Sequence, residues 1–251
     1  MGSGPDREPT FPRALVVGAS SGIGAALVRR LAREGSRVAA IARRHELLLE
    51  LARGFPDGRV LAYAHDVQRT DEVPELLERI LAELGGLDLF VYAAGAMPRV
   101  GRDEYDTGRD LAMVRTNFEG LVAWGNAVAL ALRKQGSGVI VGISSVAGDR
   151  GRRFAPAYCA TKAAMSSWLD ALHNRLWEDG VHGCPLRPGH VATDMPRGMT
   201  LVFPISPDEA ARAILAAARS RARVRYVPRR WAPVALALRW MPAFVMRRFE
   251  S

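Results

Sequence analysis

Short, fully apolar runs alternate along this chain with longer segments whose apolar residues recur at helical spacing. The apolar runs predict buried strands, and the amphipathic segments predict helices. We expect strands at 14–17, 37–42, 60–64, 87–93, 139–144 and 181–187, and helices at 23–33, 45–53, 72–84, 110–133 and 156–179. Such alternation, with right-handed crossovers, predicts a single-domain α/β fold of the Rossmann type: a doubly wound parallel sheet with helices on both faces.

The length of 251 residues suits one large core. Residues 1–11 contain prolines and acidic residues but no apolar run, which predicts a flexible lead rather than a secretory signal. The domain is expected over 12–226, followed by a C-terminal tail over 227–251. Two cysteines, Cys159 and Cys184, are too few for a disulfide framework and lack metal-ligand spacing, so we expect a reduced, cytoplasmic protein without a metal site.

The net charge of +9 comes almost entirely from arginine, because Lys134 and Lys162 are the only lysines. A basic protein attracts nucleic acid, anionic lipid or a phosphate-rich cofactor, and bulk charge does not choose among them. The arginines are spread over the whole length rather than gathered in a tract with aromatic partners. We therefore expect no nucleic-acid partner.

The sequence GASSGIG follows the first expected strand and opens the first helix. Glycines there permit a tight turn, close approach of a pyrophosphate and close helix packing, and the free amides of a helix start suit a diphosphate. The alternative is a simple turn. The loop predicts a dinucleotide site formed by Gly18, Ser20, Ser21, Gly22, Ile23 and Gly24.

The end of the second strand bears on cofactor choice. Where an NAD enzyme places an acidic residue, this sequence has Ala42, Arg43 and Arg44. Arginine suits a 2′-phosphate, so we predict NADP(H) rather than NAD(H). A solvated basic helix start is the alternative.

Two further strand ends are candidate cofactor contacts. Asp66, followed by Val67, ends the third strand, where its carboxylate can accept a hydrogen bond from an adenine amino group or cap a helix. Ala94 and Gly95 follow the fourth strand, where small residues let a cofactor lie against backbone. Core packing is the alternative for this second pair.

Tyr158 and Lys162 stand four residues apart on an expected helix, so their side chains share one face. A phenol has a pKa of about 10, and a nearby ammonium stabilises its phenolate. The tyrosine can then exchange a proton with a substrate oxygen while hydride moves at the adjacent carbon. Ser145, at the end of the preceding strand, can hydrogen-bond that oxygen. A surface pair is the alternative.

Four motifs occur in one order at consistent distances: GASSGIG, ISSVAG at 143–148, YCATK at 158–162 and PGHVATD at 188–194. Over roughly residues 12 to 220 the chain resembles the short-chain dehydrogenase/reductase family. The resemblance implies that Ser145 stabilises the substrate oxygen, Tyr158 is the acid/base, and Lys162 grips the nicotinamide ribose. It also implies that Asn117 supports a proton-relay water. Ser145, rather than Ser144, has the family's usual spacing of thirteen residues from the tyrosine.

The resemblance extends to the substrate side. It implies nicotinamide contacts from Pro188, Gly189, Val191 and Thr193, and a lid over 194–207. Two residues depart from the family pattern, Val17 in place of threonine and Tyr92-Ala93 in place of an asparagine pair, and we expect them to remove hydrogen bonds that support the sheet.

The lid residues favour a hydrophobic substrate, although they could instead be core. These are Met195, Met199, Leu201, Val202 and Phe203. Arginines beside the expected cleft leave open an acidic substrate group or a carrier protein. They are Arg99, Arg102, Arg150, Arg152 and Arg153.

Beyond residue 226 an apolar stripe recurs near helical spacing among arginines, at Trp231, Val234, Leu238, Met241 and Val245. It predicts packing on the domain or on a subunit partner, with peripheral membrane contact through 229–249 as the alternative. Prolines and Arg239 interrupt 231–246, which is shorter than the ~20 residues of a spanning helix. We therefore predict no transmembrane helix.

Together these features predict an NADP(H)-dependent oxidoreductase acting on a hydrophobic ketone or secondary alcohol, assembled as a homodimer or homotetramer through its long helices. A sugar or polyol dehydrogenase on the same fold is one alternative. A non-enzymatic dinucleotide sensor is another, which the set Asn117, Ser145, Tyr158 and Lys162 disfavours because a sensor needs no acid/base tyrosine.

Overall fold

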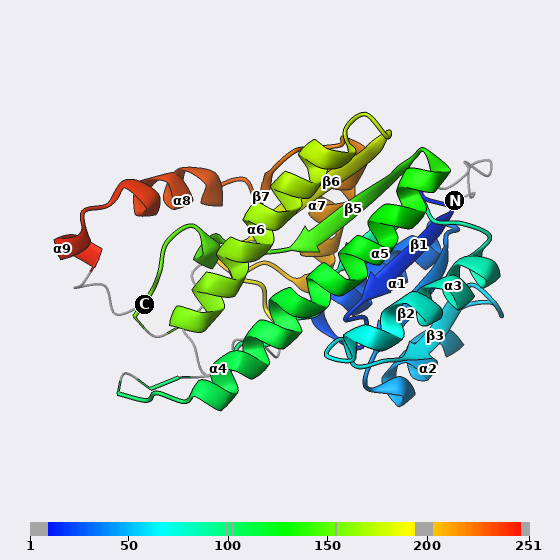
Figure 1. Cartoon of the computed structure of the whole chain (residues 1–251), viewed down its shortest axis with the longest axis horizontal. Coiled ribbons are helices and arrows are strands. Elements are labelled where there is room, and N and C mark those ends of the chain that lie inside the picture. Colours follow the sequence, from blue (N-terminus) through cyan, green and yellow to red (C-terminus); the bar gives the residue numbers. More distant parts are fainter. Residues whose placement is uncertain (1–9, 99, 102, 154, 194–202, 247–251) are drawn as a thin grey trace, which may run out of the picture.

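A computed structural model describes residues 10–98, 100–101, 103–153, 155–193 and 203–246. Seven parallel strands form one sheet in the order β3-β2-β1-β4-β5-β6-β7 (Figure 1). They are β1 Arg13–Val17, β2 Arg37–Ala42, β3 Val60–Ala64, β4 Leu89–Tyr92, β5 Gly138–Ile143, β6 Val181–Pro188 and β7 Arg225–Val227. The strand order reverses between β1 and β4, which places a ligand crevice outside their carboxyl ends.

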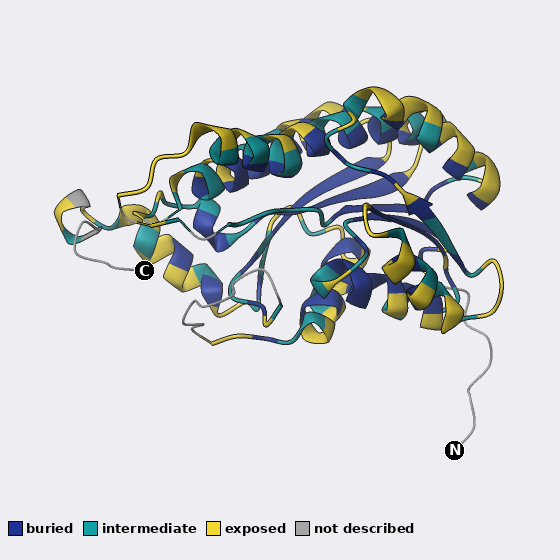
Figure 2. Ribbon diagram, turned by 90° about the horizontal axis from the view of Figure 1, so that it is seen from below, coloured by how far each residue is buried: buried dark blue, intermediate teal, exposed yellow. Residues whose placement is uncertain are grey.

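Helices cover both faces of the sheet (Figure 2). One face carries α1 Gly22–Arg33, α2 His45–Arg53 and α7 Pro207–Arg219. The other carries α3 Val73–Leu84, α5 Gly120–Gln135 and α6 Pro156–Leu176. The remaining helical elements are η1 Thr70–Glu72, α4 Thr107–Val114, η2 Arg115–Glu119, η3 Val146–Gly148, α8 Trp231–Trp240 and α9 Ala243–Met246.

The strands are apolar throughout because each face of the sheet meets a helix layer. In β1, Ala14 and Val16 pack toward α1, while Leu15 and Val17 pack toward the opposite layer. The predicted fold class is confirmed, and the six expected strands end within two residues of the observed bounds. Helix α7 and strand β7 were not among the expected elements. Among the described residues, no helix is long and apolar enough to cross a membrane.

The helix expected over 110–133 lies within a continuous helical segment, Thr107 to Gln135, that contains a π-helical turn. The chain forms α4, then the π-helical turn η2, then α5. Tyr92 donates a 2.6 Å hydrogen bond to the carbonyl of Thr116 within the π turn. Gly120 permits this approach, since a Cβ there would overlap the Tyr92 hydroxyl. Tyr92, expected to weaken the sheet, supplies a hydrogen bond of its own.

Candidate active site

The glycine loop turns at the carboxyl end of β1, directly against the end of β4. Gly18 has φ +88°, and a Cβ there would lie 2.6 Å from the Cα of Ala94. The amides of Gly18 and Ala19 donate to the carbonyl of Ile41 at 2.8 and 3.0 Å. Glycine is therefore needed at position 18 both for backbone conformation and for space.

The start of α1 forms a concave backbone surface. A Cβ on Gly24 would overlap the carbonyl oxygen of Gly18, and one on Gly22 would lie 3.2 Å from Cγ2 of Thr193. The first turn of α1 contains no acidic residue, so the positive end of its dipole is uncompensated by its own side chains. A surface made of backbone at a helix N-terminus fits the diphosphate of a dinucleotide.

Arg44 lies over this loop. Its Nη2 donates to Oγ of Ser20 and to Oγ of Ser21, each at 2.8 Å. Arg43 is mostly exposed, with Nη1 3.9 Å from Oδ2 of Asp66. Two guanidinium groups therefore stand beside the glycine loop, at the ends of β2 and β3.

The other predicted adenine-side residues line the ends of β3 and β4. Asp66 accepts a hydrogen bond from the amide of Gln68 at 3.1 Å, so one carboxylate oxygen holds the turn after β3. Val67 is buried, and Ala94 and Gly95 are half-buried. These four residues thus follow the same edge of the sheet as the glycine loop.

Tyr158 and Lys162 lie in the first turns of α6, which begins at Pro156. The Nζ of Lys162 lies 5.6 Å from the centre of the Tyr158 ring. It also donates to the carbonyl of Ile143, the last residue of β5, at 2.8 Å. Lys162 is buried. The helix and the strand end together hold the ammonium beside the phenol.

Ser144 and Ser145 have separate surroundings. Ser145 caps the start of η3, accepts a 3.1 Å hydrogen bond from the amide of Ala147, and acts on Tyr158 by lowering the pKa of its phenol. Ser144 is buried and donates to the carbonyl of Lys162 at 2.8 Å, with its Oγ 2.7 Å from that of Ser166. Ser145 therefore faces the phenol, and Ser144 joins β5 to α6.

Burial sets the ionisation of the pair. It raises the pKa of Tyr158 to about 12, against the hydrogen bond from Ser145, which lowers it. It lowers the pKa of Lys162 to about 7. The phenol is thus protonated at neutral pH, as a group that donates a proton to a carbonyl oxygen must be.

Asn117 is fully buried in η2 and uses its amide within the protein. Its Oδ1 accepts from the amide of Ala96 at 2.7 Å, and its Nδ2 donates to the carbonyl of Ala96 at 3.0 Å and to Oγ1 of Thr161 at 3.1 Å. Thr161 in turn donates to the carbonyl of Tyr158 at 2.8 Å. Asn117 thereby joins the loop after β4 to the helix turn that holds the tyrosine.

The segment after β6 returns to the glycine loop. Pro188 ends β6, and the amide of Gly189 donates to the carbonyl of Val227 at 2.9 Å. Val191 is buried and bridges to Ile205, and Thr193 lies against Gly22. The predicted nicotinamide residues thus run from the end of β6 to the start of α1.

Part of the predicted lid and arginine set lies outside the described residues, namely Met195, Met199, Leu201, Val202, Arg99 and Arg102. Phe203 is described and is 67% exposed.

The sequence analysis did not predict the ion pair between Arg187, in β6, and Asp149, which follows η3. Nη1 of Arg187 lies 2.6 Å from Oδ1 of Asp149 and 3.0 Å from the hydroxyl of Tyr226. The Asp149 side chain is 5% exposed. The pair connects the turn that follows Ser145 with the strand that leads into Pro188. A lone arginine inside an apolar strand was the available signal, because a buried charge needs a partner.

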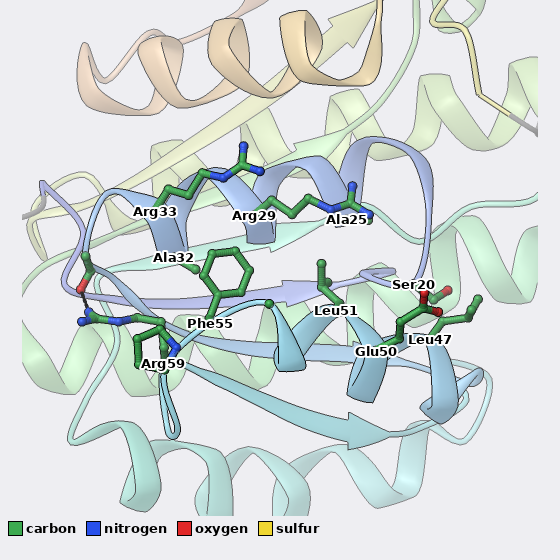
Figure 3. A pocket seen from close by; sticks show the side chains of 13 residues that line it. Ser20, Ala25, Arg29, Ala32, Arg33, Leu47, Glu50, Leu51, Phe55 and Arg59 are labelled. Carbon is green, nitrogen blue, oxygen red and sulfur yellow. Dashed lines mark hydrogen bonds between the residues drawn. The ribbon is translucent and has the colours of Figure 1, made fainter. Parts of the chain in front are cut away.

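A hollow of about 630 Å³ lies between α1 and α2 (Figure 3). Leu51 and Phe55 point into it, and Arg29 and Arg33 lie along its rim. Of the predicted cofactor residues, all of them described, Ser20 alone lines it. The hollow therefore adjoins the glycine loop at Ser20 and is not lined by Ser145, Tyr158 or Lys162.

Comparison with known proteins agrees with this arrangement. The profile of the short chain dehydrogenase family matches residues 12–200. An uncharacterised oxidoreductase of Mycobacterium tuberculosis is 31% identical over 237 residues, which cover 93% of this chain and 95% of the relative.

Two solved structures share the fold. ElxO with bound NADP has a TM-score of 0.78 at 20% identity, covering 87% of this chain and 97% of that one. A 3-ketoacyl-(acyl-carrier-protein) reductase from Brucella melitensis, complexed with NADH, has a TM-score of 0.76 at 23% identity, covering 86% and 97%. The family match and the full-length relative together show that this chain is an oxidoreductase of the short-chain dehydrogenase/reductase family.

Proposed function

We propose that this protein transfers hydride between NADP(H) and a hydrophobic ketone or secondary alcohol. The proposal rests mainly on the buried amino group of Lys162, which lies 5.6 Å from the centre of the Tyr158 ring. Ser145, in the turn after β5, lowers the pKa of the same phenol. This group stands at the carboxyl end of β5, in the same crevice as the glycine loop.

The preference for NADP(H) rests on the end of β2. Ala42, Arg43 and Arg44 occupy the place of the ribose-binding acid of NAD enzymes. Arg44 is already fixed against Ser20 and Ser21, so its guanidinium loses little freedom when it pairs with a 2′-phosphate. Arg43 is 68% exposed and, within the part of the chain that the structure describes, has only a 3.9 Å ion pair with Asp66, so its guanidinium is available to the same phosphate.

The dinucleotide, held by the glycine loop, supplies or accepts the hydride. The protein supplies the proton. In the reducing direction Tyr158 donates its hydroxyl proton to the carbonyl oxygen, while Ser145 hydrogen-bonds the same oxygen. The Lys162 ammonium stabilises the phenolate that Tyr158 leaves behind. In the oxidising direction the phenolate takes the alcohol proton, so the same three residues serve both directions.

Support for a hydrophobic substrate comes from the segment that follows Thr193. Its composition is apolar, and Phe203, its first residue within the next described range, exposes 67% of its surface two residues before Ile205, which bridges to Val191. Support for a homo-oligomer comes from the outer surfaces of the long helices, where Leu130 of α5 and Trp177 at the end of α6 are 70% and 67% exposed.

Fluorescence titration with NADPH and NADH, followed by NADPH oxidation against a panel of ketones, tests the proposal. We expect tighter binding of NADPH and turnover that disappears in Tyr158→Phe while cofactor affinity stays unchanged. Tighter NADH binding would overturn the cofactor assignment. Turnover retained in Tyr158→Phe would overturn the role of the tyrosine.

A further inference from the structure

We propose that α8 and α9 form a docking face for an anionic lipid bilayer, beside the catalytic edge of the sheet. This proposal does not depend on the identity of the cofactor or substrate. The docking face is defined by Arg229, Leu236, Arg239, Trp240 and Phe244.

The docking face exposes large apolar side chains that the fold does not cover. Trp240 is 78% exposed, Phe244 65% and Leu236 59%. The opposite side of α8 is buried through Trp231 and Ala235. The helix is therefore fixed to the domain by one side and presents apolar residues on the other.

The C-terminal part of the chain, which contains α8 and α9, is strongly basic. Ten arginines and no acidic residue lie between Glu209 and Glu250, whereas the rest of the chain holds 25 basic and 26 acidic residues. Some of the ten pair with the domain, such as Arg219 with Glu34 and Arg223 with Asp170. Arg229 and Arg239 are exposed, and among the described residues neither has an ion-pair partner.

Contacts with the domain place the docking face at the catalytic edge. The ring of Trp231 lies 5.4 Å from that of His190, in the predicted nicotinamide segment, and against Gly189. Arg150, which follows the Ser145 turn, donates to the carbonyl of Met241 at 3.4 Å. Figure 1 shows α8 and α9 extending on the side toward which β5 points. A docked molecule therefore turns its catalytic edge toward the bilayer.

Exposed aromatic and aliphatic residues mixed with unpaired arginines suit an interface with anionic lipid. Apolar side chains enter the headgroup region, tryptophan is stable at that depth, and arginines pair with lipid phosphates. α8 has ten residues, so it can lie on a bilayer but not cross one.

A second copy of the chain suits this face less well than lipid does. A two-fold interface brings the same surface together from both subunits, so the arginines of one copy would meet those of the other. No acidic residue of the segment is available between Glu209 and Glu250 to pair with them. Charge complementarity therefore favours an anionic surface over self-association.

Co-sedimentation of the full-length protein with vesicles tests the proposal. We would compare phosphatidylcholine vesicles with vesicles that also contain phosphatidylglycerol. We expect binding to the anionic vesicles, weakened by added salt because exposed charges are screened. The double variant Leu236→Ser/Trp240→Ser should abolish this binding. Arg229→Glu/Arg239→Glu should weaken it by tenfold or more, as each arginine near such a surface contributes about 1 kcal/mol.

Matched variants elsewhere on the surface serve as controls. Leu47→Ser removes an exposed apolar residue from α2, and Arg53→Glu/Arg79→Glu reverses exposed charges on α2 and α3. Both should bind vesicles like the unchanged protein, and thermal unfolding would verify that every variant is folded. No binding to anionic vesicles, or equal losses in docking-face and control variants, overturns the proposal. So does a dimer that dissociates in Leu236→Ser/Trp240→Ser without any lipid binding.

Discussion

Lys162 places its ammonium 5.6 Å from the centre of the Tyr158 ring while donating a hydrogen bond to the carbonyl of Ile143. One helix turn separates the two residues, and the end of β5 fixes the direction of the lysine. The relationship thus depends on both a local spacing and a long-range contact. Burial changes both groups in the direction of neutrality, since it lowers the pKa of Lys162 and raises that of Tyr158.

The pKa of Lys162 predicts a pH dependence of stability. Its folded-state pKa of about 7 lies below the ordinary value of 10.5, so between these values the unfolded chain binds more protons. Stability contributed by neutral Lys162 therefore rises as the pH increases from about 7 to about 10, by up to about 1.4 kcal/mol per pH unit. Urea unfolding across this range should show a smaller rise in Lys162→Met than in the unchanged protein. Equal slopes in the two proteins would contradict the assignment.

Tyr158 has the opposite effect on folding stability, and this effect appears at higher pH. Its folded-state pKa of about 12 exceeds the ordinary value of 10, so the folded chain keeps a proton that the unfolded chain loses. Stability is therefore lost as the pH increases from about 10 toward 12. Tyr158→Phe should lose less stability over this interval, measured by the same unfolding experiment, with the exposed Tyr105→Phe as control.

Cofactor discrimination should depend on Arg44. Replacing it with alanine removes a guanidinium that is already fixed against Ser20 and Ser21. Charged hydrogen bonds contribute about 1.5–3 kcal/mol each, so the Kd for NADPH should rise roughly 10- to 100-fold, while that for NADH changes little. Fluorescence titration measures both constants. Arg53→Ala, on the same helix α2, should leave both unchanged, and a parallel loss of NADH affinity in Arg44→Ala would contradict a phosphate contact.

Much of this architecture was accessible from sequence because the strands are buried on both faces. Apolar runs such as Leu15 to Val17 in β1 then mark strands directly, and motif spacing locates Tyr158 and Lys162. The π turn within 110–133 was not accessible, since the hydrogen bond to its Thr116 carbonyl comes from Tyr92, which lies outside that helix. The Arg187–Asp149 pair joins residues 38 positions apart, and no local pattern connects them.

The Arg187–Asp149 pair should matter more to stability than an exposed pair does. Arg187→Met leaves the 5%-exposed Asp149 without its cation, and breaking a buried pair costs about 3–5 kcal/mol. Arg133→Met, which removes an exposed pair with Asp179, should cost about 1 kcal/mol or less. Urea unfolding compares the two. Similar losses would mean that solvent screens the Arg187 pair as well.

Asn117 should help to position Tyr158, because its side chain hydrogen-bonds Thr161, which hydrogen-bonds the Tyr158 carbonyl. Asn117→Ala removes three buried hydrogen bonds and leaves the amide of Ala96 and Oγ1 of Thr161 without that partner. Unsatisfied buried groups cost about 1–3 kcal/mol each, so the variant should be less stable and slower in NADPH oxidation. Asn126→Ala, on the exposed side of α5, is the matched control. Unchanged stability in Asn117→Ala would show that the three hydrogen bonds are replaceable.

A comparison of alanine substitutions at Gly18, in the glycine loop, and at Gly58, in the turn before β3, separates the effect of backbone strain from that of steric contact. Both have positive φ, +88° and +73°, so alanine at either position incurs a conformational cost of about 1–2 kcal/mol. A Cβ at Gly58 meets nothing within 4 Å, whereas one at Gly18 lies 2.6 Å from the Cα of Ala94. Gly18→Ala must therefore push β1 away from β4 at the crevice where the dinucleotide binds. We expect Gly58→Ala to lose modest stability with unchanged NADPH affinity, and Gly18→Ala to lose more stability together with that affinity. If Gly18→Ala bound NADPH as tightly as Gly58→Ala does, close contact between the loop and β4 would not be what shapes the cofactor site.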